Sequence, residues 1–498
     1  MAKTLSKRYS GVLAHPTSFP SPYGIGDFGK GAYDFINFLT GAGQSLWQIL
    51  PLGHTGYGDS PYQAFSAFAG QPLLISPDEL IKDGLLYGDD LRNYPHFNPD
   101  HIYYGDVIPA KLRILHRSYE IFKESADLCM LKEFDVFCEH EKDWLDDYAL
   151  FMAGKDAHGG ACWLEWEDDL RDPDEEIKAA WRERLADSIE YYKYIQFIFF
   201  RQWNAIRDYA HVNGIKIVGD IPIFVALDSA DTWSHPELFQ LSEGCVPKAV
   251  AGCPPDAFSA TGQLWGNPLY DWEYHKKTGY DWWILRIGYS YRLYDIVRVD
   301  HFRGFEAYFS IPYGDETAVN GHWEKGPDFE LFAAMKMKLG KKEMIAEDLG
   351  VITPPVRKMI KKCGYPGMKV LQFAFDSYDS EYLPHNYDKN CIVYTGTHDN
   401  QTTRGWYEEN NRKVQKYIRE YLRVKSGKDV VEAMIATAMS STAGTAVIPM
   451  QDWLGLGREA RMNFPSTLGD NWKWRLTDGQ LTDALAAHMK DVTETYCR

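Results

Sequence analysis

Two short runs carry the fold, IKIVGDIPI at 215–223 and DIVRVD at 295–300. Both are continuous and rich in Ile and Val, a pattern typical of strands buried on both faces of a parallel sheet. Six further runs of this kind occur, at 9–14, 45–52, 343–348, 368–373, 391–396 and 445–450. Eight such strands, alternating with helices, favour a closed (β/α)8 barrel, the TIM barrel, over an open sheet.

Amphipathic stretches between these runs predict the helices. GAYDFINFLTGAG at 31–43 collects its apolar side chains on one face. TPPVRKMIKKCG at 353–364 begins with Thr353 as N-cap and Pro354 at the first helical position, and it ends at Gly364. These signals predict where each helix begins and ends.

Two long stretches interrupt the alternation of strand and helix. Residues 78–190 are rich in Asp, Glu, Trp and Tyr, and we expect a largely helical insertion subdomain there. Residues 226–280, rich in Gly, Pro and aromatics, follow the third predicted strand. A barrel places such a loop over its active-site face, so we expect an irregular insertion. Because the strand pattern resumes afterwards, we expect residues 1–498 to form a single catalytic barrel.

Composition excludes several classes of protein. The net charge of −17 argues against binding nucleic acid, which requires concentrated Lys and Arg. No run approaches the roughly 18 apolar residues of a membrane span, and the N-terminus shows no secretory signal. The eight cysteines form no CxxC pair, which favours reduced thiols and a cytoplasmic location. Aromatics reach 15%, and their flat apolar faces suit sugar rings.

Three carboxylates stand at the ends of predicted strands. Asp300 closes one run, Glu347 closes another, and Asp399 closely follows a third. A charged group at the end of a buried strand is costly unless it has a use. All three fall at carboxyl ends of strands, the face where barrel active sites lie. The sequence therefore predicts an active site built from these acids.

Glycoside chemistry requires such a set of acids. A retaining enzyme uses one carboxylate as nucleophile and another as acid and then base. Arg298, two residues before Asp300 on the same face of its strand, is expected to keep that carboxylate ionised. Glu347 must begin protonated, so we expect a dry setting and a nearby negative charge to raise its pKa. A third acid, Asp399, can favour the charged transition state.

The sequence motifs of several other enzyme classes are missing from this chain. There is no P-loop, HExxH or GxSxG motif, and GDFGKGAY at 26–33 lacks the full dinucleotide fingerprint. His301 and His398 could suggest a metal, but each sits beside a candidate acid and can bind sugar hydroxyls instead. We expect no cofactor and no metal in the mechanism. An oxidoreductase barrel is therefore a distant alternative.

Motifs along nearly the whole chain resemble the 4-alpha-glucanotransferases, also called amylomaltases or disproportionating enzymes, of glycoside hydrolase family 77. The resemblance is carried by HPTSFPSPYGIGDFG, GDSPYQAFSAFAG, GDIPIFVALDSADTW, GCPPDAFSATGQLWGNPLYDW, RVDHFRGFEAYFSIP, IAEDLGVITP, PGMKVLQFAFD, YTGTHDNQTTRGWY, RMNFPST and NWKWR. One departure is Ser466, where the family usually has Gly. The family also lacks the separate C-terminal β-domain of α-amylases, in line with the 48 residues that follow the eighth run.

The resemblance implies a role for each site residue. Asp300 would be the nucleophile, Glu347 the general acid and base, and Asp399 the transition-state stabiliser. Substrate-binding roles are implied for Arg298, His398, Asp220, Tyr62, Asp256, Gln263, Trp265, Phe373 and Tyr57. Within this set, Tyr62 resembles an aromatic platform and Asp256, Gln263 and Trp265 resemble a flap over the cleft.

The same acids serve hydrolysis and transfer, so they do not decide between the two. A flap and an aromatic cleft favour a bound sugar over water as acceptor. We therefore expect transfer between α-1,4-glucans, maltooligosaccharides and amylose, with release of glucose and with cyclic glucans left open as a further product. The alternatives are an α-amylase-like hydrolase and a non-catalytic glucan-binding barrel.

Overall fold

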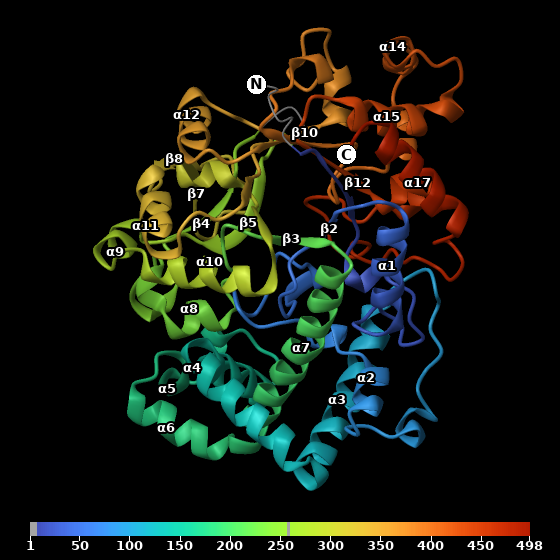
Figure 1. Ribbon diagram of the computed structural model, residues 1–498. Coiled ribbons are helices and arrows are strands. Elements are labelled where there is room, and N and C mark those ends of the chain that lie inside the picture. The colour runs from blue at the N-terminus through green and yellow to red at the C-terminus, as the bar shows by residue number, and fades with distance from the viewer. Residues whose placement is uncertain (1–6, 256–258) are drawn as a thin grey trace.

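Eight parallel strands form the central sheet of the computed structural model, which describes residues 7–255 and 259–498 (Figure 1). In sheet order they are β10 (Gly367–Val370), β11 (Cys391–Tyr394), β12 (Thr445–Pro449), β1 (Tyr9–Leu13), β2 (Leu46–Gln48), β3 (Lys216–Ile221), β6 (Ile296–Val299) and β9 (Met344–Ala346). The amide of Ala346 donates to the carbonyl of Pro366 at 3.0 Å, which brings the two edge strands β9 and β10 together. The predicted (β/α)8 barrel is confirmed, as a nearly closed sheet.

The strands are shorter than the apolar runs that predicted them. The run at 45–52 contributes only β2, although the amide of Ile49 still donates to Val218 of β3 at 2.9 Å. Pro51 has no N–H to donate to a ladder, so the chain leaves the sheet there. The rest of the apolar run is buried in the loop at the carboxyl end of the barrel.

Helices surround the barrel, and the two helices predicted above are confirmed. α1 (Lys30–Gly41) buries one apolar face, and α12 (Pro354–Cys363) begins after Thr353 and ends at Gly364, whose φ is 77°. The other helices of this layer are α10 (Asp281–Leu293), α11 (Phe329–Leu339), α13 (Thr403–Glu409), α14 (Arg412–Leu422), α15 (Val430–Ser440), α16 (Met450–Trp453) and α17 (Asp483–Thr495).

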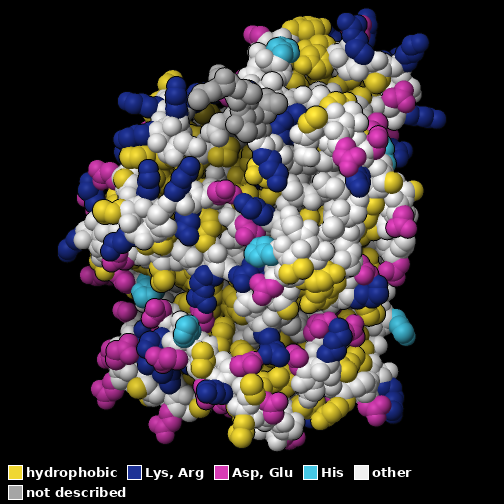
Figure 2. All heavy atoms as spheres, in the orientation of Figure 1, with side chains coloured by type: hydrophobic (Ala, Val, Ile, Leu, Met, Phe, Trp, Pro, Cys, Tyr) yellow, Lys and Arg dark blue, Asp and Glu magenta, His cyan; other side chains and the backbone are white. Residues whose placement is uncertain are grey.

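A large helical segment separates β2 from β3 and projects from the lower part of the molecule in Figure 1. Its helices are α2 (Pro77–Lys82), α3 (Tyr104–Ser125), α4 (Leu128–Ala157), α5 (Asp168–Arg171), α6 (Glu175–Arg184) and α7 (Ala186–Val212). Acidic side chains gather over α5 and α6 at the lower left of Figure 2, where they account for part of the net negative charge. Within residues 7–255 and 259–498, no helix is both long and apolar enough to cross a membrane.

A second, antiparallel sheet was not predicted from the sequence. Its strands, in sheet order, are β5 (Gln263–Pro268), β4 (Ala249–Cys253), β7 (Ala307–Pro312) and β8 (His322–Lys325). Two of them, together with α8 (Ala230–Ser234) and α9 (Trp272–Lys277), lie in the stretch 226–280 that was expected to be irregular. β4 lies between β5 and β7, so its pairing depends on a strand more than 50 residues away that local sequence does not reveal.

Candidate active site

The three predicted acids follow three strands of the barrel at its carboxyl end. Asp300 comes directly after β6, Glu347 directly after β9, and Asp399 five residues after β11. The amide of Phe302 donates to the carbonyl of Glu347 at 3.1 Å, so the first two strand ends lie side by side. The structure therefore brings Asp300 and Glu347 to neighbouring positions on the face where barrel active sites form.

A buried arginine connects two aspartates of the site. Arg298 is almost fully buried, and its guanidinium lies 2.9 Å from Asp300 Oδ1 and forms a second ion pair with Asp220. Asp220 itself is fully buried. A buried charge is tolerated when it is paired and hydrogen-bonded. Asp220 therefore holds the guanidinium in position, and Arg298 in turn orients the carboxylate of Asp300.

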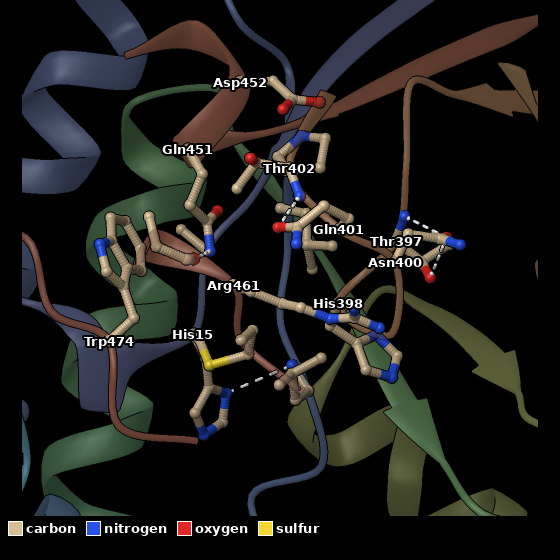
Figure 3. Close-up of a pocket in the computed structure, with 16 residues that line it drawn as sticks. His15, Thr397, His398, Asn400, Gln401, Thr402, Gln451, Asp452, Arg461 and Trp474 are labelled. Carbon is tan, nitrogen blue, oxygen red and sulfur yellow. Dashed lines mark hydrogen bonds between the residues drawn. The ribbon is translucent and has the colours of Figure 1, made fainter. Parts of the chain in front are cut away.

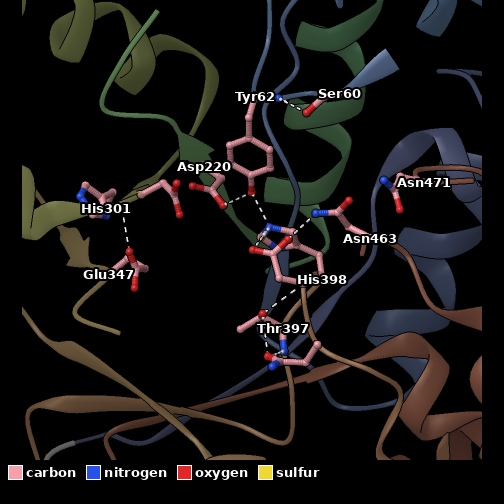
Figure 4. A network of polar contacts seen from close by, with 12 residues as sticks. Ser60, Tyr62, Asp220, His301, Glu347, Thr397, His398, Asn463 and Asn471 are labelled. Atoms are coloured by element: carbon pink, nitrogen blue, oxygen red, sulfur yellow. Dashed lines mark hydrogen bonds and ion pairs between the residues drawn. The ribbon is translucent and has the colours of Figure 1, made fainter. Parts of the chain in front are cut away.

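Tyr62 joins this ion-pair network to His398 (Figure 4). Its hydroxyl lies 2.9 Å from Asp220 Oδ2 and 2.9 Å from His398 Nε2, and the Tyr62 and His398 rings stack at 5.3 Å with an interplanar angle of 17°. A phenol has one proton to donate, and the carboxylate of Asp220 can only accept. The hydroxyl therefore accepts from His398, which must carry its proton on Nε2.

Glu347 is 8% exposed, and both its carboxyl oxygens accept backbone hydrogen bonds. The amides of His301 and Leu349 each donate at 2.7 Å, and Figure 4 shows the first of these contacts. Burial, followed by the charge of Asp300, raises the pKa of Glu347 from 4.5 to about 8, although Arg298 and the two amides oppose the rise. The prediction of a raised pKa for this residue is confirmed.

The pKa of Asp300 differs from the expectation that was based on Arg298 alone. Burial raises its pKa, and the guanidinium of Arg298 opposes that rise without reversing it. The side chain nevertheless keeps 31% of its surface exposed. The sequence revealed the adjacent arginine but could not reveal the desolvation, which is the larger effect.

Asp399 is the most exposed of the three acids, with 43% of its side chain accessible. Asn463 donates to its Oδ1 at 2.6 Å, and Arg461 donates to its backbone carbonyl at 2.9 Å. His398 Nε2 lies 3.4 Å from its other carboxylate oxygen. The sequence analysis did not assign Asn463 or Arg461 to the site, although both belong to the motif RMNFPST.

The remaining predicted residues are placed as follows. Trp265 lies on β5, where its indole N–H donates to Gln263 Oε1 at 3.1 Å and its ring meets His301 edge-on at 4.8 Å. Phe373 lies in the 3-10 turn Leu371–Phe375 after β10, against Tyr382. Asp256 lies outside the described residues. For Tyr57 only the backbone is described, at the start of the turn Tyr57–Asp59.

A small pocket adjoins His398 on the side of β12 (Figure 3). Its volume of about 20 Å³ is small beside the roughly 300–1,000 Å³ of typical ligand pockets. Asp452 lines it and accepts hydrogen bonds from the Thr395 hydroxyl at 2.5 Å and the Thr403 hydroxyl at 2.6 Å. These bonds fix both ends of the loop that carries His398 and Asp399.

Comparison with known proteins agrees with this geometry. A family model described as 4-alpha-glucanotransferase matches residues 14–482. The chain is 48% identical over 489 residues to a 4-alpha-glucanotransferase of Clostridium butyricum, covering 97% of this chain and 99% of the relative. It is 46% identical over 495 residues to that of Thermus thermophilus, covering 98% of each. An amylomaltase structure from Streptococcus agalactiae, in complex with acarbose, matches with a TM-score of 0.96 and 40% identity, covering 99% of this chain and 100% of that chain.

Proposed function

The chain belongs to the 4-alpha-glucanotransferase family, glycoside hydrolase family 77, and from this premise we propose that Asp300, Glu347 and Asp399 carry out its transfer reaction with retention. The enzyme transfers segments of α-1,4-glucans. Asp300 attacks the anomeric carbon while Glu347 gives its proton to the departing glycosidic oxygen. Glu347 then takes the proton of an acceptor 4-hydroxyl, which attacks the same carbon and breaks the bond to Asp300.

One observation carries this assignment, the contrast between the two neighbouring acids. The carboxylate of Asp300 has a guanidinium at 2.9 Å, whereas Glu347 has only neutral backbone donors and a pKa raised to about 8. A nucleophile must be ionised and a general acid must be protonated, and neighbouring carboxyls with different surroundings meet both needs. Asp399, held by Asn463, supports the positive charge that develops on the sugar.

Transfer rather than hydrolysis requires a sugar in the acceptor position. Trp265 packs edge-on against His301, the residue after Asp300, Phe373 packs against Tyr382, and the Tyr62 ring stacks on His398. We propose maltooligosaccharides and amylose as both donor and acceptor, with glucose released. We also propose that acarbose inhibits the enzyme, in line with the complex of the Streptococcus agalactiae amylomaltase.

The product ladder from maltotriose tests the substrates and the transfer. Glucose together with chains longer than maltotriose is expected, whereas products confined to glucose and maltose would contradict transfer. Asp300→Ala should lower turnover by at least 10³-fold while the protein remains folded. Glu343→Gln is the matched control, because Glu343 is an exposed carboxylate directly before β9, at the end of the strand away from Glu347. This variant should leave the rate unchanged.

We further propose that residues 78–190 are an insertion in one catalytic unit. The indole of Trp163 donates to the carbonyl of Leu227 at 2.7 Å, and that of Trp233 donates to Leu170 at 2.9 Å, so contacts run in both directions between the insertion and the segment after β3. A single calorimetric unfolding transition is expected. Two separate transitions would contradict the proposal.

A cytoplasmic location is also proposed. Cys245 and Cys391 are buried free thiols, which suit a reducing compartment. Cell fractionation followed by immunoblotting tests this location.

A further inference from the structure

Trp472 packs against two aromatic residues of the site. Its ring lies 6.0 Å from the ring of Tyr62 and 6.0 Å from that of His398, the same two rings that stack on each other. Only 5% of the residue is exposed. We infer that Trp472 is a positioning residue for the transfer reaction, which holds the Tyr62 and His398 rings in register with Asp220 and Asp399. The inference rests on the proposed function of that site.

The backbone of Trp472 supports a role in placement. Its φ is 64°, in the left-handed region that residues other than Gly rarely adopt. A bulky side chain persists there only when the surroundings hold it. The Trp472 amide donates to the Met462 carbonyl at 2.7 Å, and its own carbonyl accepts from the Tyr104 hydroxyl at 3.0 Å. The conformation therefore costs free energy, and it aims the ring at the site.

The segment on either side of Trp472 is held as firmly. The amide of Ile102 donates to the carbonyl of Lys473 at 2.8 Å, and the amide of Arg475 donates to Asp100 at 3.2 Å. Before Trp472, the side chain of Asn471 accepts from the amide of Phe464 at 2.8 Å. These hydrogen bonds anchor residues 471–475 to the start of the helical insertion and to the loop after Asn463. The position of the Trp472 ring beside Tyr62 and His398 depends on these anchors.

The consequence for the reaction follows from geometry. Tyr62 Oη bonds both Asp220 and His398 at 2.9 Å, a distance that tolerates little displacement of either ring. If the Trp472 ring is removed, the stacked pair gains space on one side and the shared hydrogen bonds lengthen. Misplacement of catalytic groups by about 1 Å can lower a rate ~100-fold. Turnover should suffer more than substrate affinity, because Trp472 is buried and acts on the reaction only through the placement of the Tyr62 and His398 rings.

Three substitutions at Trp472 distinguish a role in positioning the Tyr62 and His398 rings from a role in packing the core alone. Trp472→Ala and Trp472→Gly both remove the ring, but glycine also relieves the positive φ. Trp472→Phe keeps a smaller ring. Trp181→Ala is the matched control, because Trp181 is 6% exposed and packs on His158 in the insertion, away from the acids. Each variant is assayed for kcat and KM on maltotriose, and for Tm by calorimetry.

We expect Trp472→Ala and Trp472→Gly to lower kcat by the same factor, ~10- to 100-fold, with KM changed less than threefold. The kcat of Trp472→Phe should lie between that of the truncations and that of the wild type. Glycine should have the higher Tm of the two truncations, so activity and stability separate. The control should lower Tm and keep kcat. Equal kcat in wild type and Trp472→Phe, together with kcat in the truncations that follows Tm, would overturn the inference. If the truncations do not fold, the Phe variant decides alone.

A parallel assay of Asp300→Ala distinguishes this inference from the proposed function. Loss of turnover in Asp300→Ala with full turnover in the Trp472 variants would reject only the positioning role. Retained turnover in Asp300→Ala would reject the assignment of the site itself.

Discussion

The raised pKa of Glu347 predicts the pH dependence of the enzyme. With a pKa of about 8, roughly nine-tenths of the enzyme holds this proton at pH 7, whereas with the ordinary value of 4.5 about one molecule in 300 would do so. Transfer should therefore remain near its maximum at pH 7, and kcat/KM should fall about tenfold for each pH unit above 8. Because kcat/KM reports the free enzyme, the basic limb should have its midpoint near the pKa of Glu347.

The charge of Asp300 supplies part of this rise, so removing it gives a second measurement. In Asp300→Asn the pKa of Glu347 should fall, yet it should stay above 4.5 because burial is the larger cause. Titration of ¹³C-labelled glutamate by NMR measures this in the inactive variant. Initial rates of glucose release from maltotriose between pH 4 and 10 measure the wild type.

The raised pKa of Glu347 also makes the free energy of unfolding depend on pH. The folded protein keeps the Glu347 proton to a higher pH than the unfolded chain, so this group removes stability as pH rises from 4.5 to 8. The loss is about 5 kcal/mol at most. Glu347→Gln cannot titrate, so its free energy of unfolding in guanidinium chloride should fall less over that range than that of the wild type. A basic midpoint below about pH 6, or equal pH slopes of stability in both proteins, would refute the reasoning.

Three further outcomes are expected. Tyr62→Phe breaks the hydroxyl contacts with Asp220 and His398 and should lower kcat ~10-fold in steady-state assays, with a rate within twofold of wild type as the contrary result. Asn463→Ala removes the 2.6 Å hydrogen bond to Asp399 and should lower kcat ~10-fold. Asn463→Asp should lower kcat further, because it places two carboxylates together. An Asp variant as active as the Ala variant would contradict this. Ser466 has a φ of 63°, so Ser466→Gly should stabilise the protein by about 0.5–1 kcal/mol in denaturant unfolding, and a loss of stability would show that the serine side chain matters there.

The strands, two of the helices and the location of the three acids could be read from the sequence. Apolar runs reveal buried strands because side chains within one run share the same surroundings. In a parallel barrel all carboxyl ends of the strands lie on one face, so an acid that ends a strand is assigned to that face without knowledge of its neighbours. Thr353 and Gly364 likewise bound α12 by local rules of helix ends.

The tertiary structure alone decided what surrounds the acids. Asn463 and Trp472 reach the site from the C-terminal part of the chain, and β4 finds its partner β7 across more than 50 residues. The pKa of Glu347 depends on desolvation, which is a property of all the atoms packed around it. Local patterns record the conformation of consecutive residues, whereas burial and charge at a site are set by segments that only folding brings together. The sequence thus located the acids, and the fold determined how strongly each of them is desolvated and which charges surround it.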